Sequence, residues 1–178
     1  VRDADPDTVL ERLQPFAELA PLTGQQVGIQ SYADVMGAFV QPGPHAGQGE
    51  PHAHSGLVEH ITPEFARAAA TFLASGTTHF FQFRAVGGAV ADVPADATAY
   101  AGRSAAFSLT AISGDPVAFD RAWAGMQPWL TGAYLSFETA RDDVARSLVW
   151  PAAHLERLRA LKSQWDPDGV FRDNLGLG

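Results

Sequence analysis

The stretch Leu161-Lys-Ser-Gln-Trp-Asp-Pro-Asp-Gly-Val-Phe-Arg-Asp-Asn174 carries a helix end into a turn and then into a short apolar segment. At its centre, Asp166-Pro167-Asp168-Gly169 has the chemistry of a turn. Proline fixes φ, glycine permits a positive φ, and aspartate side chains accept hydrogen bonds from nearby backbone N–H groups. Val170 and Phe171 then return to an apolar environment. By itself, the pattern is that of a helix, a turn and a docked tail.

Capping residues and apolar spacing predict four helices. Three of them begin where an N-cap side chain precedes a proline, at Asp5-Pro6, Thr62-Pro63 and Asp115-Pro116. The fourth begins near Pro151. Their apolar stripes are Val9, Leu10, Leu13 and Phe16; Phe65, Ala69, Phe72 and Leu73; Phe119, Trp123, Met126 and Leu130; and Leu155, Leu158 and Leu161.

Five runs between and around these helices have strand character. They cover about residues 27–32, 54–60, 79–86, 106–112 and 133–137. Strands separated by helices, with some close pairs, predict an α+β fold: one mainly antiparallel sheet with helices covering one face.

The alternation within these runs sorts side chains between the two faces of the sheet. Residues such as Phe81, Phe83 and Leu109 fall on an apolar face that belongs against helices. The opposite face collects Gln82, Arg84, Ser108, Thr110, Tyr134 and Ser136. An ordinary solvated face gives the same alternation, so the pattern alone leaves a binding surface and a solvated surface open.

Composition excludes several classes of protein. The chain has 178 residues and a formal net charge of −8, which argues against binding to nucleic acid phosphates. It has no apolar run long enough to span a bilayer, so no membrane partner is expected. Without cysteine it can form no disulfide and no Cys-ligated metal site. It also has no glycine-rich motif of the kind that cradles a dinucleotide pyrophosphate.

Five further segments match one known family in the same order. They are Ser31-Tyr32, His54-Ser55-Gly56-Leu57, Phe83-Arg84-Ala85-Val86-Gly87-Gly88-Ala89-Val90, Asp96-Ala97-Thr98-Ala99-Tyr100 followed by Arg103, and Gly132-Ala133-Tyr134-Leu135-Ser136-Phe137. Together with the C-terminal stretch, they resemble the FAD-linked oxidases of the berberine bridge enzyme-like group. The resemblance covers the chain from about Asp5 onward.

This resemblance implies that residues 1–178 form a single substrate-binding (cap) domain, with residues 148–178 as the berberine-like C-terminal motif. It implies an FAD-dependent oxidoreductase that transfers hydride from a carbohydrate, alcohol or secondary metabolite to flavin. FAD would be held mainly by the protein's own N-terminal flavin-binding domain. Because the chain starts at Val1, we expect it to be the C-terminal part of a longer, cytoplasmic flavoprotein and to be inactive alone.

The resemblance also assigns roles near the flavin. Tyr134 matches the family's flavin-side tyrosine and would act as the catalytic base on the substrate hydroxyl. Asn174 matches a terminal asparagine that approaches the flavin. Ser136 stands where the family usually has asparagine, a departure that removes an amide from the cofactor's surroundings. A packed tyrosine and a tail-capping asparagine are the alternatives.

Substrate contacts are expected from the polar face, at Gln82, Arg84, Ser108 and Thr110. The resembled family places substrate-binding side chains on the strand of Gln82 and Arg84, sometimes including an acidic base. No acidic residue occupies either position here, so a carboxylate base on this strand is excluded. A surface ion pair is the alternative for Arg84.

Two other hypotheses remain. His45, His52 and His54 have spacing compatible with a metal site, but the resembled family has none there, and we expect no metal. The chain is alternatively a stand-alone, non-catalytic α+β ligand-binding or interaction domain. In either case the exposed sheet face is expected to allow self-association.

Overall fold

The structure is a computed structural model that describes residues 5–21, 24, 28, 30–38, 50–172 and 175–177. The chain divides into two compact units, Val1–Ala46 and Gly47–Gly178. No helix in the described part of the chain is both long and apolar enough to cross a membrane.

The first unit contains two helices, α1 (Pro6–Ala17) and α2 (Tyr32–Ala38). Asp5 caps α1 by accepting a hydrogen bond from the Thr8 backbone N–H, as its sequence predicts. The strand expected over residues 27–32 is wrong where the structure describes it, because Tyr32 begins α2. The Ser31 hydroxyl accepts from the backbone N–H of Asp34 and caps a helix there.

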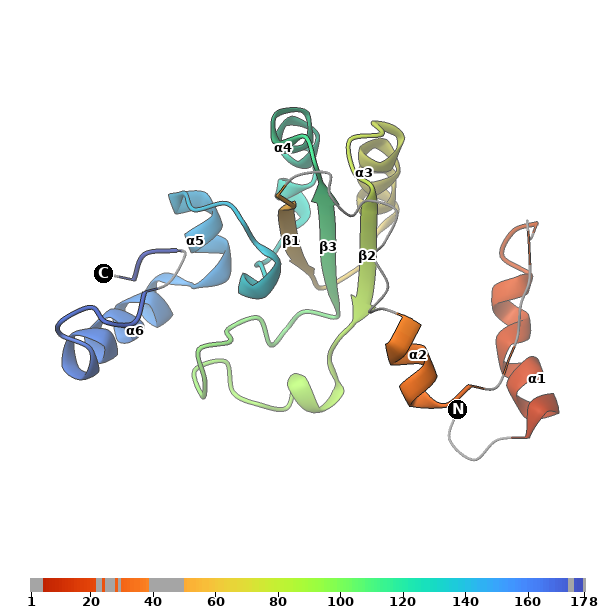
Figure 1. Cartoon of the computed structure of the whole chain (residues 1–178), viewed down its shortest axis with the longest axis horizontal. Helices are drawn as coiled ribbons and strands as arrows, with labels where there is room; N and C mark the ends of the chain where they lie inside the picture. The colour runs from red at the N-terminus through yellow and green to blue at the C-terminus, as the bar shows by residue number, and fades with distance from the viewer. Residues whose placement is uncertain are drawn as a thin grey trace. The chain divides into compact units, whose positions relative to one another are not determined.

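The second unit is built on a three-stranded antiparallel sheet in the order β1-β3-β2 (Figure 1). The strands are β1 (His52–Val58), β2 (Phe80–Ala85) and β3 (Phe107–Ser113). A short 3₁₀ turn, η1 (Gly88–Val90), follows β2. The α+β fold class predicted from the sequence is confirmed, with fewer strands among the described residues than expected.

One face of the sheet is covered by α3 (Pro63–Ala74) and α4 (Pro116–Trp123), seen end-on in Figure 1. Both begin at the predicted caps, Thr62 and Asp115. The core between sheet and helices consists of Val58, Phe65, Ala69, Phe72, Leu109, Ala111, Phe119, Trp123 and Met126. The period-2 assignment of the apolar face is therefore correct.

A second, smaller core lies near the C-terminus. It joins α5 (Asp143–Val149), which the sequence did not predict, to α6 (Ala152–Trp165), which it did. Its buried members are Ala133, Ala145, Val149, Trp150 and Leu175. Leu158 packs partly buried against this core, whereas Leu161 is exposed, contrary to the predicted stripe.

The strand expected over residues 133–137 is wrong. The segment does run beside the free edge of β1, because Leu57 bonds to Gly132 and the Thr139 N–H bonds to the Ala53 carbonyl. Yet four positions separate Leu57 from Ala53 while seven separate Gly132 from Thr139. The excess residues loop outward and form the 3₁₀ turn η3 (Leu135–Phe137).

Candidate functional site

The polar face of the sheet is ordered by the strand register. Gln82 and Ser55 flank Thr110 across the three strands, and Arg84 and Leu57 flank Ser108 in the next row. These rows lie on the face opposite α3 and α4. The sequence therefore placed Gln82, Arg84, Ser108 and Thr110 on one face correctly.

The centre of this face is closed to solvent. Thr110 is 2% exposed and Ser108 is 9% exposed, so neither contacts a bound molecule without movement of the side chains around it. Arg84 is exposed and Gln82 is half-buried. The side-chain carbonyl oxygen of Gln82 is buried and has no hydrogen-bond partner in the described part of the chain. Substrate binding by these four residues stays a prediction.

Tyr134 is held in the looped-out segment by Ser55. The Tyr134 backbone N–H donates to Ser55 Oγ at 2.8 Å, and Ser55 Oγ donates to the Tyr134 carbonyl at 2.9 Å. Ser55 is 1% exposed, whereas Tyr134 is 37% exposed. A buried hydroxyl thus fixes the backbone of Tyr134 and leaves its side chain partly open to solvent.

Aromatic and cationic groups extend from Tyr134 in two directions. The ring of Phe137 lies 5.9 Å from that of Tyr134, and the Arg84 guanidinium lies over the Phe137 ring at 4.9 Å. On the other side, Tyr100 makes an edge contact with Tyr134 at 6.3 Å, and Arg103 lies over Tyr100. Arg84 and Tyr134 therefore both contact the ring of Phe137.

The ionisation of Tyr100 differs from that of a free phenol. Burial raises the pKa of Tyr100, and although the positive charge of Arg103 opposes this, the pKa stays above its ordinary value. Tyr100 thus remains a protonated neighbour of Tyr134 at neutral pH.

Ser136 lines a hollow of about 440 Å³ beside the end of β1. The hollow is lined by Pro51, Ala53, Ile112, Leu135, Ser136, Phe137, Glu138 and Thr139. Ser136 is exposed at its rim. The predicted strand would have placed Tyr134 and Ser136 on one face, but Leu135–Phe137 form a 3₁₀ turn there.

A buried polar network behind β1 was missed by the sequence analysis. Glu138 Oε1 lies 2.9 Å from Nδ1 of His54, and Glu138 Oε2 accepts from the Ser55 N–H at 3.1 Å. Nε2 of His54 lies 2.9 Å from Asp120 Oδ1. The only sequence signal was the neighbouring His-x-His pair, because Glu138 and Asp120 join it through tertiary contacts.

The histidines and carboxylates of this network shift the pKa values of His54 and Asp120. Burial by itself would lower the pKa of His54, but the carboxylates of Glu138 and Asp120 outweigh it, and the pKa is raised. Burial by itself would raise the pKa of Asp120, but hydrogen bonds from His54 and His52 lower it. Rings of Phe119 and Trp123 stack on His54 at 5.1 and 5.4 Å.

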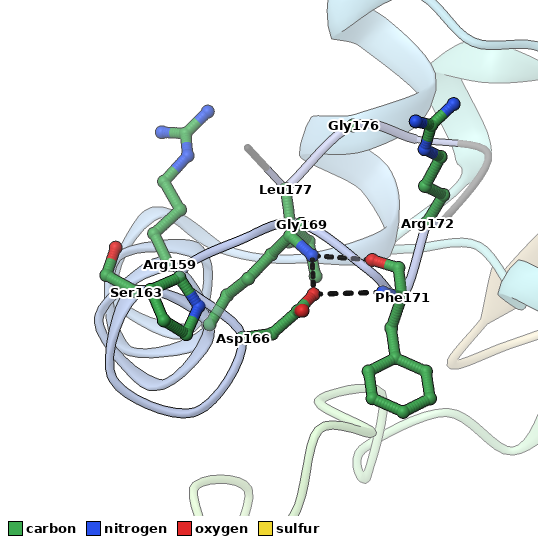
Figure 2. A pocket seen from close by; sticks show the side chains of 10 residues that line it. Arg159, Ser163, Asp166, Gly169, Phe171, Arg172, Gly176 and Leu177 are labelled. Atoms are coloured by element: carbon green, nitrogen blue, oxygen red, sulfur yellow. Dashed lines mark hydrogen bonds and ion pairs between the residues drawn. The ribbon is translucent and has the colours of Figure 1, made fainter.

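At the C-terminus, Asp166 organises the predicted turn (Figure 2). Its carboxylate accepts from the backbone N–H groups of Val170 and Phe171 and from Lys162 Nζ, at 2.7, 3.1 and 2.7 Å. Gly169 has φ of +63°, as the turn predicts. An open cavity of about 880 Å³ lies beside this turn. Asn174 lies outside the described residues, so its predicted place near the flavin stays a prediction.

This C-terminal region is the part that matches a known family. Residues 150–178 match the family model "Berberine and berberine like". The chain carries a berberine-like C-terminal segment. The family resemblance predicted from the sequence is thereby confirmed. No curated protein matches the sequence.

Solved structures share the fold over almost the whole chain. A chitooligosaccharide oxidase matches with a TM-score of 0.71 and 17% identity, covering 98% of this chain and 44% of its own. A variant of the BBE-like 1 protein of Physcomitrella patens matches with a TM-score of 0.73 and 19% identity, covering 98% and 43%.

The glucooligosaccharide oxidase of Acremonium strictum, which carries a 6-S-cysteinyl, 8α-N1-histidyl FAD, matches with a TM-score of 0.65 and 19% identity, covering 98% and 44%. The chain therefore spans less than half the length of the structures it resembles.

The turn of the berberine-like segment supplies a testable prediction. Asp166→Asn removes the negative charge opposite Lys162 and one of the two acceptors for Val170 and Phe171. We expect several-fold faster hydrogen exchange of these two amides, measured by NMR. Asp168→Asn, an exposed substitution in the same turn, is the control and should leave them unchanged.

Lowering the pH should also weaken the protection of the Val170 and Phe171 amides against hydrogen exchange. The hydrogen bond from Lys162 lowers the pKa of Asp166 below its ordinary value of 3.8. The turn is therefore stabilised above that value and loses this stabilisation as the pH falls through the lower pKa of the folded state. Protection of the two amides should fall with acid in the parent and depend much less on pH in Asp166→Asn. Identical acid profiles in both proteins would contradict this assignment.

Proposed function

We propose that the chain is the substrate-binding domain of an FAD-dependent oxidoreductase, which transfers hydride from a carbohydrate, alcohol or secondary metabolite to flavin. One observation carries this proposal: the segment that loops out from the edge of β1 presents a partly exposed tyrosine next to a phenylalanine ring that also contacts a guanidinium. The backbone of Tyr134 is hydrogen-bonded to Ser55. The Tyr134 ring and the Arg84 guanidinium both contact the ring of Phe137. The shared fold with oxidases supports it.

The residues present suit one part of FAD and not another. The sequence contains no glycine-rich turn for a diphosphate, so we assign the phosphates to a separate N-terminal domain. Rings of Tyr134 and Phe137, with the guanidinium of Arg84, suit contact with the planar ring system of a flavin. FAD, when bound, supplies the hydride acceptor.

The chain's own residues would orient the substrate and take its proton. When hydride leaves the substrate carbon for the flavin, the hydroxyl proton would pass to the phenolate oxygen of Tyr134, and the substrate C–OH would become a carbonyl. The carbonyl oxygen of Gln82 is buried and has no partner among the described residues, and it would accept a hydrogen bond from a second substrate hydroxyl once neighbouring side chains move aside. A buried acceptor without a partner costs free energy, which a bound polyol would recover.

The assignment of FAD binding to a separate upstream domain is directly testable. The 178-residue chain should purify colourless, and the same chain joined to its upstream flavin-binding domain should be yellow and reducible by substrate. Absorbance spectra after dialysis measure both. Flavin retained by the 178-residue chain alone would contradict the assignment of FAD to another domain. A colourless longer protein would contradict the oxidoreductase function itself.

A non-catalytic ligand-binding or interaction domain is the second candidate function. The serine at position 136, where the resembled family usually has asparagine, favours it. A longer protein that binds flavin and is not reduced by any alcohol or carbohydrate would support this candidate. Self-association of the isolated chain stays a prediction, and light scattering over a range of concentrations measures it.

A further inference from the structure

Two histidines and an aspartate converge on the helix-covered side of β1. Nε2 of His52 lies 2.7 Å from Asp120 Oδ1, and Nε2 of His54 lies 2.9 Å from the same oxygen. The ligand atoms of the three residues lie within 4.8 Å of one another. His52 and His54 come from β1 and Asp120 comes from α4, so strand and helix are joined at this point. We propose that these three residues form a binding site for a divalent transition metal, with Zn²⁺ as the reference ion.

The donor set and its spacing suit such an ion. Two imidazole nitrogens and one carboxylate oxygen are ligands that Zn²⁺ and its first-row neighbours accept. Tetrahedral ligands at about 2.0–2.1 Å from Zn²⁺ lie about 3.3 Å from one another. The observed N···O separations of 2.7 and 2.9 Å therefore need to widen by only about half an ångström. The side chain of Asp120 is 54% exposed, so it is free to make that adjustment.

The surroundings of His54 have the features that support a metal ligand. Its Nδ1 faces Glu138 Oε1 at 2.9 Å, so the N–H on that side is held by a carboxylate and Nε2 is directed at Asp120. This carboxylate–histidine pairing fixes the tautomer and the ring orientation of metal-bound histidines. Phe119 and Trp123 stack on the imidazole and hold its plane.

A cavity supplies room for a further ligand. It has a volume of about 130 Å³, and its lining includes His54, Asp120, Glu138, Gln127 and Asp142. Two of the three ligands, His54 and Asp120, line this cavity, and three protein ligands leave a coordination position for water or a small anion, as in open zinc sites. From the sequence, no metal was expected at His45, His52 and His54, because the resembled family has none there. The third ligand is Asp120, which the fold brings to His52 and His54 from α4.

Metal titration tests the proposal. The 178-residue chain, stripped with a chelator, is titrated with Zn²⁺ by calorimetry and with Co²⁺ by visible absorbance. We expect one saturable equivalent of Zn²⁺ and a d–d absorption band with Co²⁺ from an N₂O donor set. Metal binding should also raise the melting temperature, because it links β1 to α4.

Matched variants locate the site. His52→Gln and Asp120→Asn remove one ligand each at partly exposed positions, so the fold should survive, as circular dichroism checks. Each should weaken Zn²⁺ binding by at least about tenfold. The control is His60→Gln, at an exposed histidine outside the cluster, and it should bind as the parent does. Absence of a saturable equivalent, or equal binding by all four proteins, would overturn the proposal.

Discussion

Tyr134→Phe in the longer, flavin-containing protein should lower kcat by about 10²–10⁴ and change KM little. This expectation rests on the proposed function. Phenylalanine keeps the ring that packs against Phe137 and Tyr100 and deletes only the phenol oxygen. The backbone clamp by Ser55 involves only main-chain atoms of Tyr134 and is retained. The loss should therefore fall on proton transfer and not on packing.

Rapid-mixing measurement of flavin reduction under anaerobic conditions isolates the step concerned. Tyr100→Phe is the matched control, because it removes a neighbouring phenol that we expect to stay protonated. It should slow flavin reduction much less than Tyr134→Phe does. If the rate of flavin reduction in Tyr134→Phe is within about threefold of the parent's rate, Tyr134 is a packing residue, because a general base accelerates the reaction far more than this.

Much of the second unit follows from local sequence signals. Thr62 and Asp115 each provide an N-cap before proline, and α3 and α4 begin there. Alternation in β2 and β3 places Phe81 and Leu109 against those helices. Both signals are local, because capping and strand alternation act over a few residues.

The region around Tyr134 did not follow from local pattern. Residues 133–137 alternate like a strand, yet the buried Ser55 hydroxyl and the Glu138 carboxylate take the hydrogen bonds that a strand partner would supply. Competition between side-chain and backbone partners is settled by tertiary contacts, which the segment's own sequence does not contain. The same holds for Asp120, whose meeting with His54 depends on the packing of α4 on the sheet.

Removal of the Glu138 carboxylate should be the most destabilising single change in this network. The Glu138 side chain is 4% exposed and that of His54 is 9% exposed. The carboxylate of Glu138 also accepts hydrogen bonds from the backbone N–H groups of Ser55 and Ala140. Breaking a buried ion pair by deleting one partner typically costs about 3–5 kcal/mol. We expect a loss of about that size in the free energy of unfolding for Glu138→Ala, measured by urea denaturation with a chelator present.

Two further variants separate charge from hydrogen bonding. Glu138→Gln keeps the volume and one acceptor, so it should cost about 1–3 kcal/mol. Adding His54→Phe to Glu138→Ala should recover part of the loss, because the new ring stacks on Phe119 and Trp123 and no buried imidazole is left without its carboxylate partner. The two backbone N–H groups still lack their acceptor, so recovery should be incomplete. Glu156→Ala, on an exposed position of α6, is the control and should change stability by less than about 0.5 kcal/mol. A loss below about 1 kcal/mol for Glu138→Ala would mean that water replaces the carboxylate, and that the 131–139 segment holds its place beside β1 without it.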